Sequence, residues 1–325
     1  MQYLLISLLS LYVCSYVTAG YLKTETKLFS VFVGETQVNI SQEVFPTPTT
    51  CGNCISDLSF LNLHENENTS VVAARSFLYT NGGSLTKFVK KTPSRYVTFV
   101  IGKTTYTVDP NRMFTDEGIK ASLQTNGMYS DEAAAAVKNL ADEVLSIYGF
   151  SEQPVVLALH NNGDGYGADS YLPGGPYAND AEEVFIVPGS NPSDFFYVVD
   201  PNLYEAIAQM EYNVVLQNND TVTNDGSLSY YCGLMGMKYI NFEAVAETTA
   251  YGKQVVLQFD MIEAIKQILF SDNASFVASS GSPAASAASG SGTCSCTQYG
   301  GGYCSGFCNG NTCPCMNCQY WNQMC

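Results

Sequence analysis

The sequence LNLHENEN at residues 61–68 is the stretch on which the arrangement of the chain depends. It continues an apolar run at residues 58–63, typical of a buried strand, and it precedes a helix-like segment at residues 71–78. Within the polar part, His64 and Glu67 are three positions apart, so both side chains can face one point at a strand end or in a first helical turn. This pattern predicts a pair of metal ligands.

The second histidine of the chain stands at a similar junction. The sequence contains only two histidines, and His160 ends an apolar, strand-like run at residues 154–159. His, Glu and His are the ligands of a catalytic zinc ion that keeps a water in its fourth position. We therefore predict that His64, Glu67 and His160 hold Zn2+. A single His-x-x-Glu pattern is common by chance, however, so structural histidines stay open as an alternative.

The length and the composition indicate a folded domain with an acidic surface. The 325 residues suffice for one large domain with appendages, and 46% of them are hydrophobic. The formal net charge of −16 argues against nucleic acid and anionic membranes as partners, because both attract basic surfaces. The acidity suits solubility outside the cell, but it names no partner.

The first 19 residues have the features of a secretory signal peptide. An apolar run at residues 4–17 precedes small side chains before Gly20, although no Lys or Arg stands in front of it. The run is shorter than the ~20 residues that a membrane span needs, so we expect no span and a secreted, extracellular protein. Four Asn-x-Ser/Thr sequons are compatible with a secreted glycoprotein; they begin at Asn39, Asn68, Asn219 and Asn273.

The distribution of the 12 cysteines predicts a disulfide-rich module at the C-terminus. Eight of them lie in the last 32 residues, a density typical of an oxidising compartment. A thiolate metal cluster is the alternative, but it needs a reducing location. Outside this module and the leader stand Cys51, Cys54 and Cys232. Cys51 and Cys54 favour a local structural disulfide, and the odd count leaves one cysteine unpaired unless it bonds outside the domain.

Strand and helix patterns alternate along the chain. Strand patterns occupy residues 28–33, 36–40, 58–63, 95–99, 103–108, 154–159, 195–199, 213–217 and 238–242, and helix patterns occupy residues 70–80, 130–148, 202–210 and 255–270. Asn68, Thr69 or Ser70 is the expected N-cap of the first helix. The alternation predicts an α/β fold with a mixed, mostly parallel sheet flanked by helices.

Composition sets the expected domain boundaries. A stretch of small residues near the C-terminus has nothing to bury and is typical of a linker. We expect a signal peptide at residues 1–19, the α/β domain at residues 20–273, a Ser/Ala/Gly-rich linker at residues 274–293 and the disulfide-rich module at residues 294–325.

Two further motifs carry groups that suit hydrolysis beside a carboxylate. Arg112 presents a planar fork that can grip a carboxylate, and Asn111 adds a donor. Strand alternation puts Glu243 on one face with Tyr239 and Asn241. A carboxylate near a zinc-bound water can accept its proton and pass it to the leaving amine. Taken alone, a surface turn and a solvated strand end are the simpler interpretations.

The order of these motifs resembles that of the zinc carboxypeptidase superfamily, with its succinylglutamate desuccinylase and aspartoacylase relatives. His-x-x-Glu comes first, then Asn-Arg, then a second His and a strand-terminal Glu, over residues 55–270. The resemblance implies a mixed sheet with one zinc ion at the carboxyl ends of its strands. It implies that His64, Glu67 and His160 hold zinc, that Asn111 and Arg112 bind a substrate carboxylate, that Glu243 is the general base and acid, and that Arg95, which no motif marks, stabilises the oxyanion.

The sequence also departs from the family pattern. The segment between Glu67 and Asn111 is short for a digestive-type carboxypeptidase, which favours the compact amidohydrolase-like branches. The Tyr that covers the substrate has three candidates, Tyr230, Tyr231 and Tyr251. No residue can be assigned to a side-chain specificity pocket, so the exact substrate does not follow.

Two classes of function remain open. The first is a secreted zinc hydrolase of an amide or peptide bond next to a free carboxylate, with peptides or N-acyl amino acids as substrates. The second is a non-catalytic protein on the same fold that binds a wall or polysaccharide through its C-terminal module. That module contains the aromatic residues Tyr299, Tyr303, Phe307, Tyr320 and Trp321. The complete set of catalytic-type residues favours the enzyme.

Overall fold

The computed structural model describes most of the α/β region and part of the C-terminal backbone. It describes residues 24–48, 58–90, 92–163, 165–246 and 252–270, and the backbone of residues 295–299, 303–308 and 311–314. Contacts between Cα atoms divide the chain into two compact units, residues 1–277 and residues 278–325. The expected signal peptide, the linker, the Cys51–Cys54 pair and the side chains of the C-terminal cysteines lie outside the described residues. These features and the domain boundaries stay predictions.

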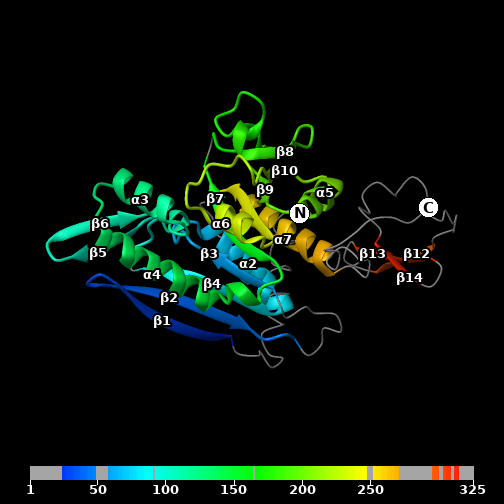
Figure 1. The fold of residues 1–325 in the computed structure, drawn as a ribbon. Helices are drawn as coiled ribbons and strands as arrows, with labels where there is room; N and C mark the ends of the chain where they lie inside the picture. The colour runs from blue at the N-terminus through cyan, green and yellow to red at the C-terminus, as the bar shows by residue number, and fades with distance from the viewer. Residues whose placement is uncertain are drawn as a thin grey trace, which may run out of the picture. The chain divides into compact units, whose positions relative to one another are not determined.

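The larger unit is built on a nine-stranded mixed sheet (Figure 1). Its strands run in the order β1 (Glu25–Val33), β2 (Thr36–Phe45), β4 (Gly83–Val89), β3 (Ser59–Asn62), β7 (Val156–Asn162), β11 (Tyr239–Val245), β9 (Phe195–Val198), β10 (Val214–Gln217) and β8 (Ala181–Phe185). The four central strands, from β4 to β11, are parallel. The pairs β1–β2, β2–β4, β11–β9 and β10–β8 are antiparallel. The predicted mixed α/β class is therefore confirmed.

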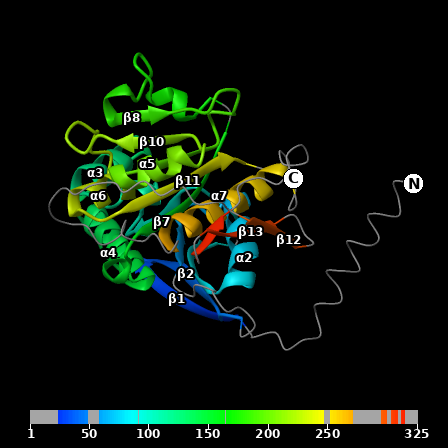
Figure 2. The ribbon, with the colours of Figure 1, turned by 90° about the vertical axis from the view of Figure 1, so that its right-hand side faces the viewer.

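Helices cover both faces of this sheet, as Figure 2 shows. One face carries α2 (Asn68–Asn81), α5 (Pro201–Gln209) and α7 (Lys253–Phe270), and the other carries α3 (Asp116–Thr125), α4 (Asp131–Tyr148) and α6 (Leu228–Met235). Successive strand residues point to opposite faces. Phe60 therefore belongs to the core under α2, and Leu61 belongs to the core under α4. The sheet is buried on both sides, and its strand ends are left to form a site.

Shorter elements complete the description. A separate hairpin consists of β5 (Val97–Ile101) and β6 (Thr104–Val108). The 3-10 turns are η2 (Pro110–Arg112), η3 (Phe150–Glu152), η4 (Ala168–Tyr171) and η5 (Ala178–Asp180). In the second unit, β12 (Ser295–Tyr299), β13 (Tyr303–Cys308) and β14 (Asn311–Pro314) form an antiparallel sheet. No helix in the described part of the chain is long and apolar enough to cross a membrane.

Local sequence signals place several boundaries correctly. The Ser130 side chain accepts a hydrogen bond from the Ala133 amide at the start of α4, and Gly149 ends that helix with a φ of 74°. Two expectations are wrong. Glu67 is the N-cap residue of α2 and makes no side-chain cap bond. Glu243 lies inside β11 instead of ending it, because pairing with β7 continues to Val245.

Candidate metal centre and cavity

His64 is held in the turn that connects β3 to α2. The Glu67 amide donates to the His64 carbonyl at 3.0 Å, which closes a tight turn between the two residues. The His64 ring is buried between two carboxylates. Its Nδ1 lies 2.8 Å from Oε1 of Glu67, and its Nε2 lies 2.7 Å from Oδ1 of Asp109. Since Asp109 occupies Nε2, the nitrogen that faces the centre is Nδ1.

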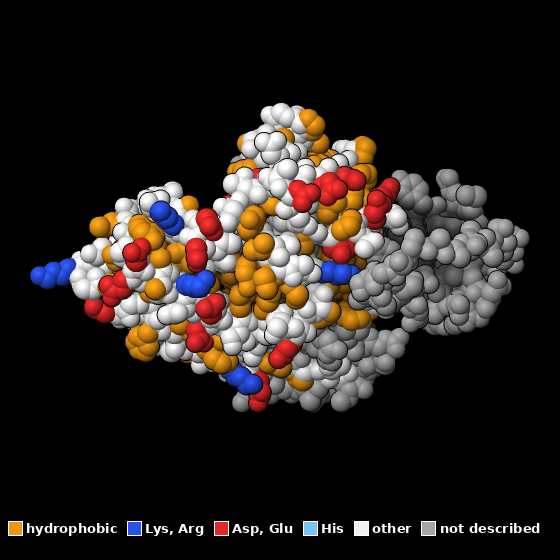
Figure 3. All heavy atoms as spheres, in the orientation of Figure 1, with side chains coloured by type: hydrophobic (Ala, Val, Ile, Leu, Met, Phe, Trp, Pro, Cys, Tyr) orange, Lys and Arg blue, Asp and Glu red, His pale blue; other side chains and the backbone are white. Residues whose placement is uncertain are grey.

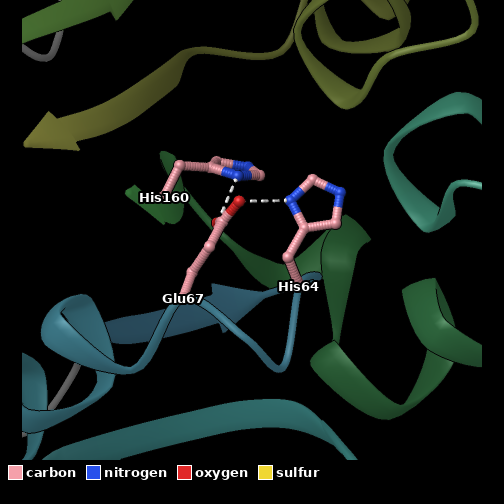
Figure 4. A group of neighbouring side chains, drawn as sticks. All are labelled: His64, Glu67 and His160. Atoms are coloured by element: carbon pink, nitrogen blue, oxygen red, sulfur yellow. Dashed lines mark hydrogen bonds and ion pairs between the residues drawn. The ribbon is translucent and has the colours of Figure 1, made fainter. Parts of the chain in front are cut away.

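His160 reaches the same point from the neighbouring strand. β3 and β7 are parallel neighbours, so their carboxyl ends meet at one edge of the sheet. His160 Nδ1 lies 2.9 Å from Oε2 of Glu67. Figure 4 shows the Glu67 carboxylate between the two imidazole rings, whose centroids are 5.0 Å apart. Ligand atoms of the three buried residues lie within 4.8 Å of one another, so the group could hold a metal ion.

The electrostatics of this group favour a positive charge at its centre. Burial raises the pKa of Glu67, but His64 and His160 outweigh burial and lower that pKa to about 2. Burial lowers the pKa of His64, yet the carboxylates of Glu67 and Asp109 outweigh it, and the net shift is upward. Two buried carboxylates around one ring therefore stabilise a cation, either a proton on His64 or a metal ion in its place.

Asp109 is a candidate site residue that sequence reasoning missed. It follows β6 directly and connects two parts of the predicted site. Besides His64, it accepts a hydrogen bond from Nε of Arg95 at 2.9 Å, and Arg95 Nη1 lies 3.3 Å from Oε1 of Glu67. Burial raises the pKa of Asp109, but its bonds to His64, Arg95 and the Asn111 amide hold it well below its usual range. The sequence signal was an Asp at a strand end directly before Pro-Asn-Arg.

Glu243 lies beside His160 on the next strand. The parallel register of β7 and β11 pairs the two residues directly. The Glu243 carboxyl group is buried and accepts a hydrogen bond from Nδ2 of Asn241 at 3.0 Å. Burial raises the pKa of Glu243 to about 7. The nearby Glu67 carboxylate also raises this pKa, and His160 lowers it in part. A carboxyl group with this pKa can both accept and donate a proton near neutral pH.

Asn111 and Arg112 are fixed by the segment that leads into α6. Oδ1 of Asn111 accepts a hydrogen bond from the amide of Leu228, the first residue of α6, at 3.0 Å. Nη2 of Arg112 lies 3.2 Å from Oδ2 of Asp225. Gly226 allows this approach, because its φ is 76° and a Cβ there would lie 2.8 Å from the Arg112 carbonyl oxygen. The Arg112 guanidinium is thus held by a carboxylate before any substrate binds.

A buried polar network supports the two strands that carry His160 and Glu243. The Asn161 side chain accepts a hydrogen bond from the Ser70 amide in the first turn of α2, at 2.9 Å, and so takes the capping role that was expected of residues 68–70. Nδ2 of Asn161 donates to Oε1 of Gln258 on α7 at 2.9 Å. Nε2 of Gln258 donates in turn to the carbonyls of His160 and Phe242.

The site residues predicted from the sequence line one cavity of about 620 Å³. It is lined by all seven of them: His64, Glu67, Arg95, Asn111, Arg112, His160 and Glu243. Tyr239 also lines it, on the strand face that the sequence assigned to Tyr239 and Glu243, together with four tyrosines that the sequence did not place: Tyr166, Tyr171, Tyr177 and Tyr197. Of the three candidates for a substrate-covering Tyr, Tyr230 and Tyr231 do not line the cavity, and Tyr251 lies outside the described residues.

Comparison with known proteins found solved structures to which the fold of this chain is similar. No family model matches the chain, and no curated protein matches it. The fold is similar to carboxypeptidase A from Helicoverpa armigera, at 11% identity and a TM-score of 0.39 over 74% of this chain and 67% of that chain. It is similar to the succinylglutamate desuccinylase from Chromobacterium violaceum, at 13% identity and a TM-score of 0.37 over 77% and 71% of the two chains.

A third similar structure is murein-tripeptide amidase MpaA from Escherichia coli O157. The identity is 11% and the TM-score is 0.37, over 75% of this chain and 93% of that chain. These neighbours are of the kind that the ordered motifs resemble. Because the TM-scores are below 0.5 and the identities below 25%, we infer function from the geometry of the cavity.

Proposed function

We propose that the protein is a secreted, zinc-dependent hydrolase that cleaves an amide or peptide bond next to a free carboxylate. The observation that carries this proposal is the convergence of His64 and Glu67, from the turn between β3 and α2, with His160 from β7, in a cavity that Glu243 and Arg112 also line. Residues that are up to 179 positions apart meet there (243 minus 64). Such a set is what metal-assisted hydrolysis of a carboxylate-bearing substrate requires.

The donor set fits zinc. Two imidazole nitrogens and one carboxylate are ligands that zinc takes in catalytic sites with an open position. Asp109 holds Nε2 of His64 and so directs Nδ1 toward Glu67, as an outer carboxylate does for metal-bound histidines. The buried negative charge of Glu67 and Asp109 favours a divalent cation over an empty centre. His64, Glu67 and His160 would hold the ion.

The other residues have roles that follow from their positions. A bound zinc ion would supply a water of lowered pKa and polarise the scissile carbonyl. Glu243, with its raised pKa, can take a proton from the attacking water and return it to the leaving amine. Arg112 offers a planar fork to the substrate carboxylate, in exchange for its contact with Asp225. Arg95, held over Glu67 by Asp109, can donate to the developing oxyanion.

The proposal is tested with purified full-chain protein. We expect hydrolysis of C-terminal peptide bonds or N-acyl amino acids that a chelator abolishes and that added zinc restores, with about one zinc ion per chain by elemental analysis. Metal binding without hydrolysis of any such substrate would favour the non-catalytic alternative. A chain that binds no metal would return the two histidines to a structural role.

A further inference from the structure

One wall of the cavity has no part in the metal centre or in binding the carboxylate. Tyr166, Tyr171 and Tyr177, which we call the tyrosine wall, line the cavity from the segment that follows β7. Their rings pack together, with centroids of Tyr166 and Tyr177 at 6.0 Å and of Tyr171 and Tyr177 at 5.4 Å. The hydroxyls of Tyr166 and Tyr171 are 2.7 Å apart. Tyr177 is exposed at 42%.

Asp180 lines the same cavity three residues beyond Tyr177. Its Oδ1 accepts hydrogen bonds from the Thr223 amide at 2.8 Å and from the Thr223 hydroxyl at 3.0 Å. These bonds fix the carboxylate but use only one of its oxygens. Among the described residues, Asp180 forms no ion pair with a Lys, Arg or His side chain. A half-buried, fixed carboxylate with a free oxygen can receive a cation.

The two arginines that line the cavity already have carboxylate partners. Arg95 contacts Asp109 and Glu67, and Arg112 contacts Asp225. Glu243 is buried and accepts a hydrogen bond from Asn241, and the proposed function assigns it to proton transfer. Asp180 therefore gives its side of the cavity a net negative charge, and the faces of the tyrosine rings add negative potential. A positively charged group is attracted to both features, whereas an anionic group is repelled.

The position of Asp180 relative to Arg112 indicates which part of a substrate would reach it. Thr223 binds Asp180, and Asp225, two residues later, binds Arg112. One short segment therefore links the two charged positions. A substrate residue whose carboxylate binds Arg112 would direct its own side chain toward the wall next to this segment.

We propose that the tyrosine wall and Asp180 form a specificity subsite for a positively charged side chain, of the lysine or arginine type, on the residue that carries the substrate's free carboxylate. The inference rests on the proposed function for the placement of that carboxylate. It deepens that function by naming the class of residue removed. Lysine and norleucine form a suitable pair of probes, because they have side chains of similar length that differ in charge.

The first experiment compares kcat/KM for acylated dipeptides ending in lysine, norleucine or glutamate. We expect the full-chain protein to prefer lysine over norleucine by at least about tenfold, and to act least on glutamate. Asp180→Asn keeps an oxygen for Thr223 and removes the charge, so the preference should fall to within about threefold. Asp220→Asn is the matched control, because Asp220 is exposed near Thr223 and does not line the cavity. It should retain the preference.

The second experiment measures binding and does not need turnover. Calorimetric titration with L-lysine and L-norleucine should show tighter binding of lysine to the unmodified protein, and this difference should be lost in Asp180→Asn and reduced in Tyr177→Leu. If no substrate is hydrolysed but the lysine selectivity depends on Asp180, the proposed function fails and the subsite stands. Equal binding of the two probes, or a preference that Asp180→Asn leaves intact, would overturn the subsite.

Discussion

At the scale of single residues, the two carboxylates beside His64 determine which of its nitrogens a metal can use. Asp109 occupies Nε2, so Nδ1 points at Glu67 and His160. Asp109→Asn keeps an oxygen acceptor but removes the charge that orients and polarises the ring. We expect zinc affinity to fall by about 10–100-fold, measured by competition with a chromophoric chelator. Asp116→Asn, an exposed change of the same charge, is the control, and an unchanged affinity in Asp109→Asn would remove Asp109 from the site.

Glu243 is the residue whose substitution should separate catalysis from metal binding. Glu243→Gln preserves size and the bond from Asn241, but an amide cannot take up a proton. We expect kcat to fall by at least ~10² while zinc content is unchanged. In the unmodified enzyme kcat/KM should rise with pH through a value at or below about 7, because a bound dication lowers the pKa of a neighbouring carboxyl group. Near-normal turnover by Glu243→Gln would show that another group is the base.

Arg112 should affect substrate binding more than chemistry. Its guanidinium is held by Asp225 and by the Asn111 carbonyl in the cavity, away from the Glu67 carboxylate that Arg95 contacts. We expect Arg112→Ala to raise KM for carboxylate substrates by about tenfold or more, with a smaller change in kcat. Steady-state kinetics on a peptide and on its C-terminal amide would test this. If the two substrates respond equally to Arg112→Ala, the carboxylate does not bind there.

The residues that the sequence could reveal are those with few alternatives. With only two histidines in the chain, each after an apolar run, His64 and His160 could be paired without a structure. Asp109 could not be found in this way, because its contact with His64 joins residues 45 positions apart and the chain contains many acidic residues. The tyrosine wall was hidden for the same reason, since any of 22 tyrosines could have lined a cavity.

At the scale of elements, the strands and helices that the sequence revealed are those with a clear period. α4 has acidic residues in its first turn and apolar residues at helical spacing, and its predicted and observed ranges agree within one residue. β4 was missed because it begins at Gly83, directly after Gly82, the C-cap of α2, and two glycines at this point indicate only the end of a helix. α6 was missed because its eight residues are too short to show a period.

Helix α7 is joined by hydrogen bonds to strands β7 and β11 through the side chain of Gln258. This fully buried side chain bonds to Asn161 and to the carbonyls of His160 and Phe242, so it fixes β7 against β11. Gln258→Leu has a similar volume but removes one acceptor of the Asn161 amide, which keeps its bond to the Ala244 carbonyl, and the side-chain donor to the His160 and Phe242 carbonyls. We expect a loss of about 2–4 kcal/mol of unfolding free energy by denaturant titration, together with weaker zinc binding. The control is Gln254→Leu on the same helix. A Gln258→Leu protein of normal stability would show that the network is dispensable.

At the scale of the whole molecule, acidity is the dominant feature. On the face drawn in Figure 3, acidic side chains gather over α5 and β10. With a net charge of −16, each further carboxylate that ionises increases repulsion within the folded chain. Two buried groups that line the cavity, Glu243 and His64, also make the folded chain less stable as the pH rises. The pKa of Glu243 is raised to about 7 and that of His64 is raised above 6.5, so both bind protons more tightly in the folded chain than in the unfolded chain.

The stability of the metal-free protein should therefore decrease as the pH rises. A group whose folded pKa is raised contributes stability below its unfolded pKa and loses it as the pH rises through the folded value. The lowered pKa of Glu67 acts only below pH 4.5 and does not enter this window. We expect Tm of the chelator-treated protein to fall by roughly 5–10 °C between pH 5 and pH 8. Zinc should raise Tm most at pH 8, because its ligands must be deprotonated. Glu243→Gln should show a smaller fall without metal, and an equal fall in both proteins would mean that surface charge alone sets the pH dependence.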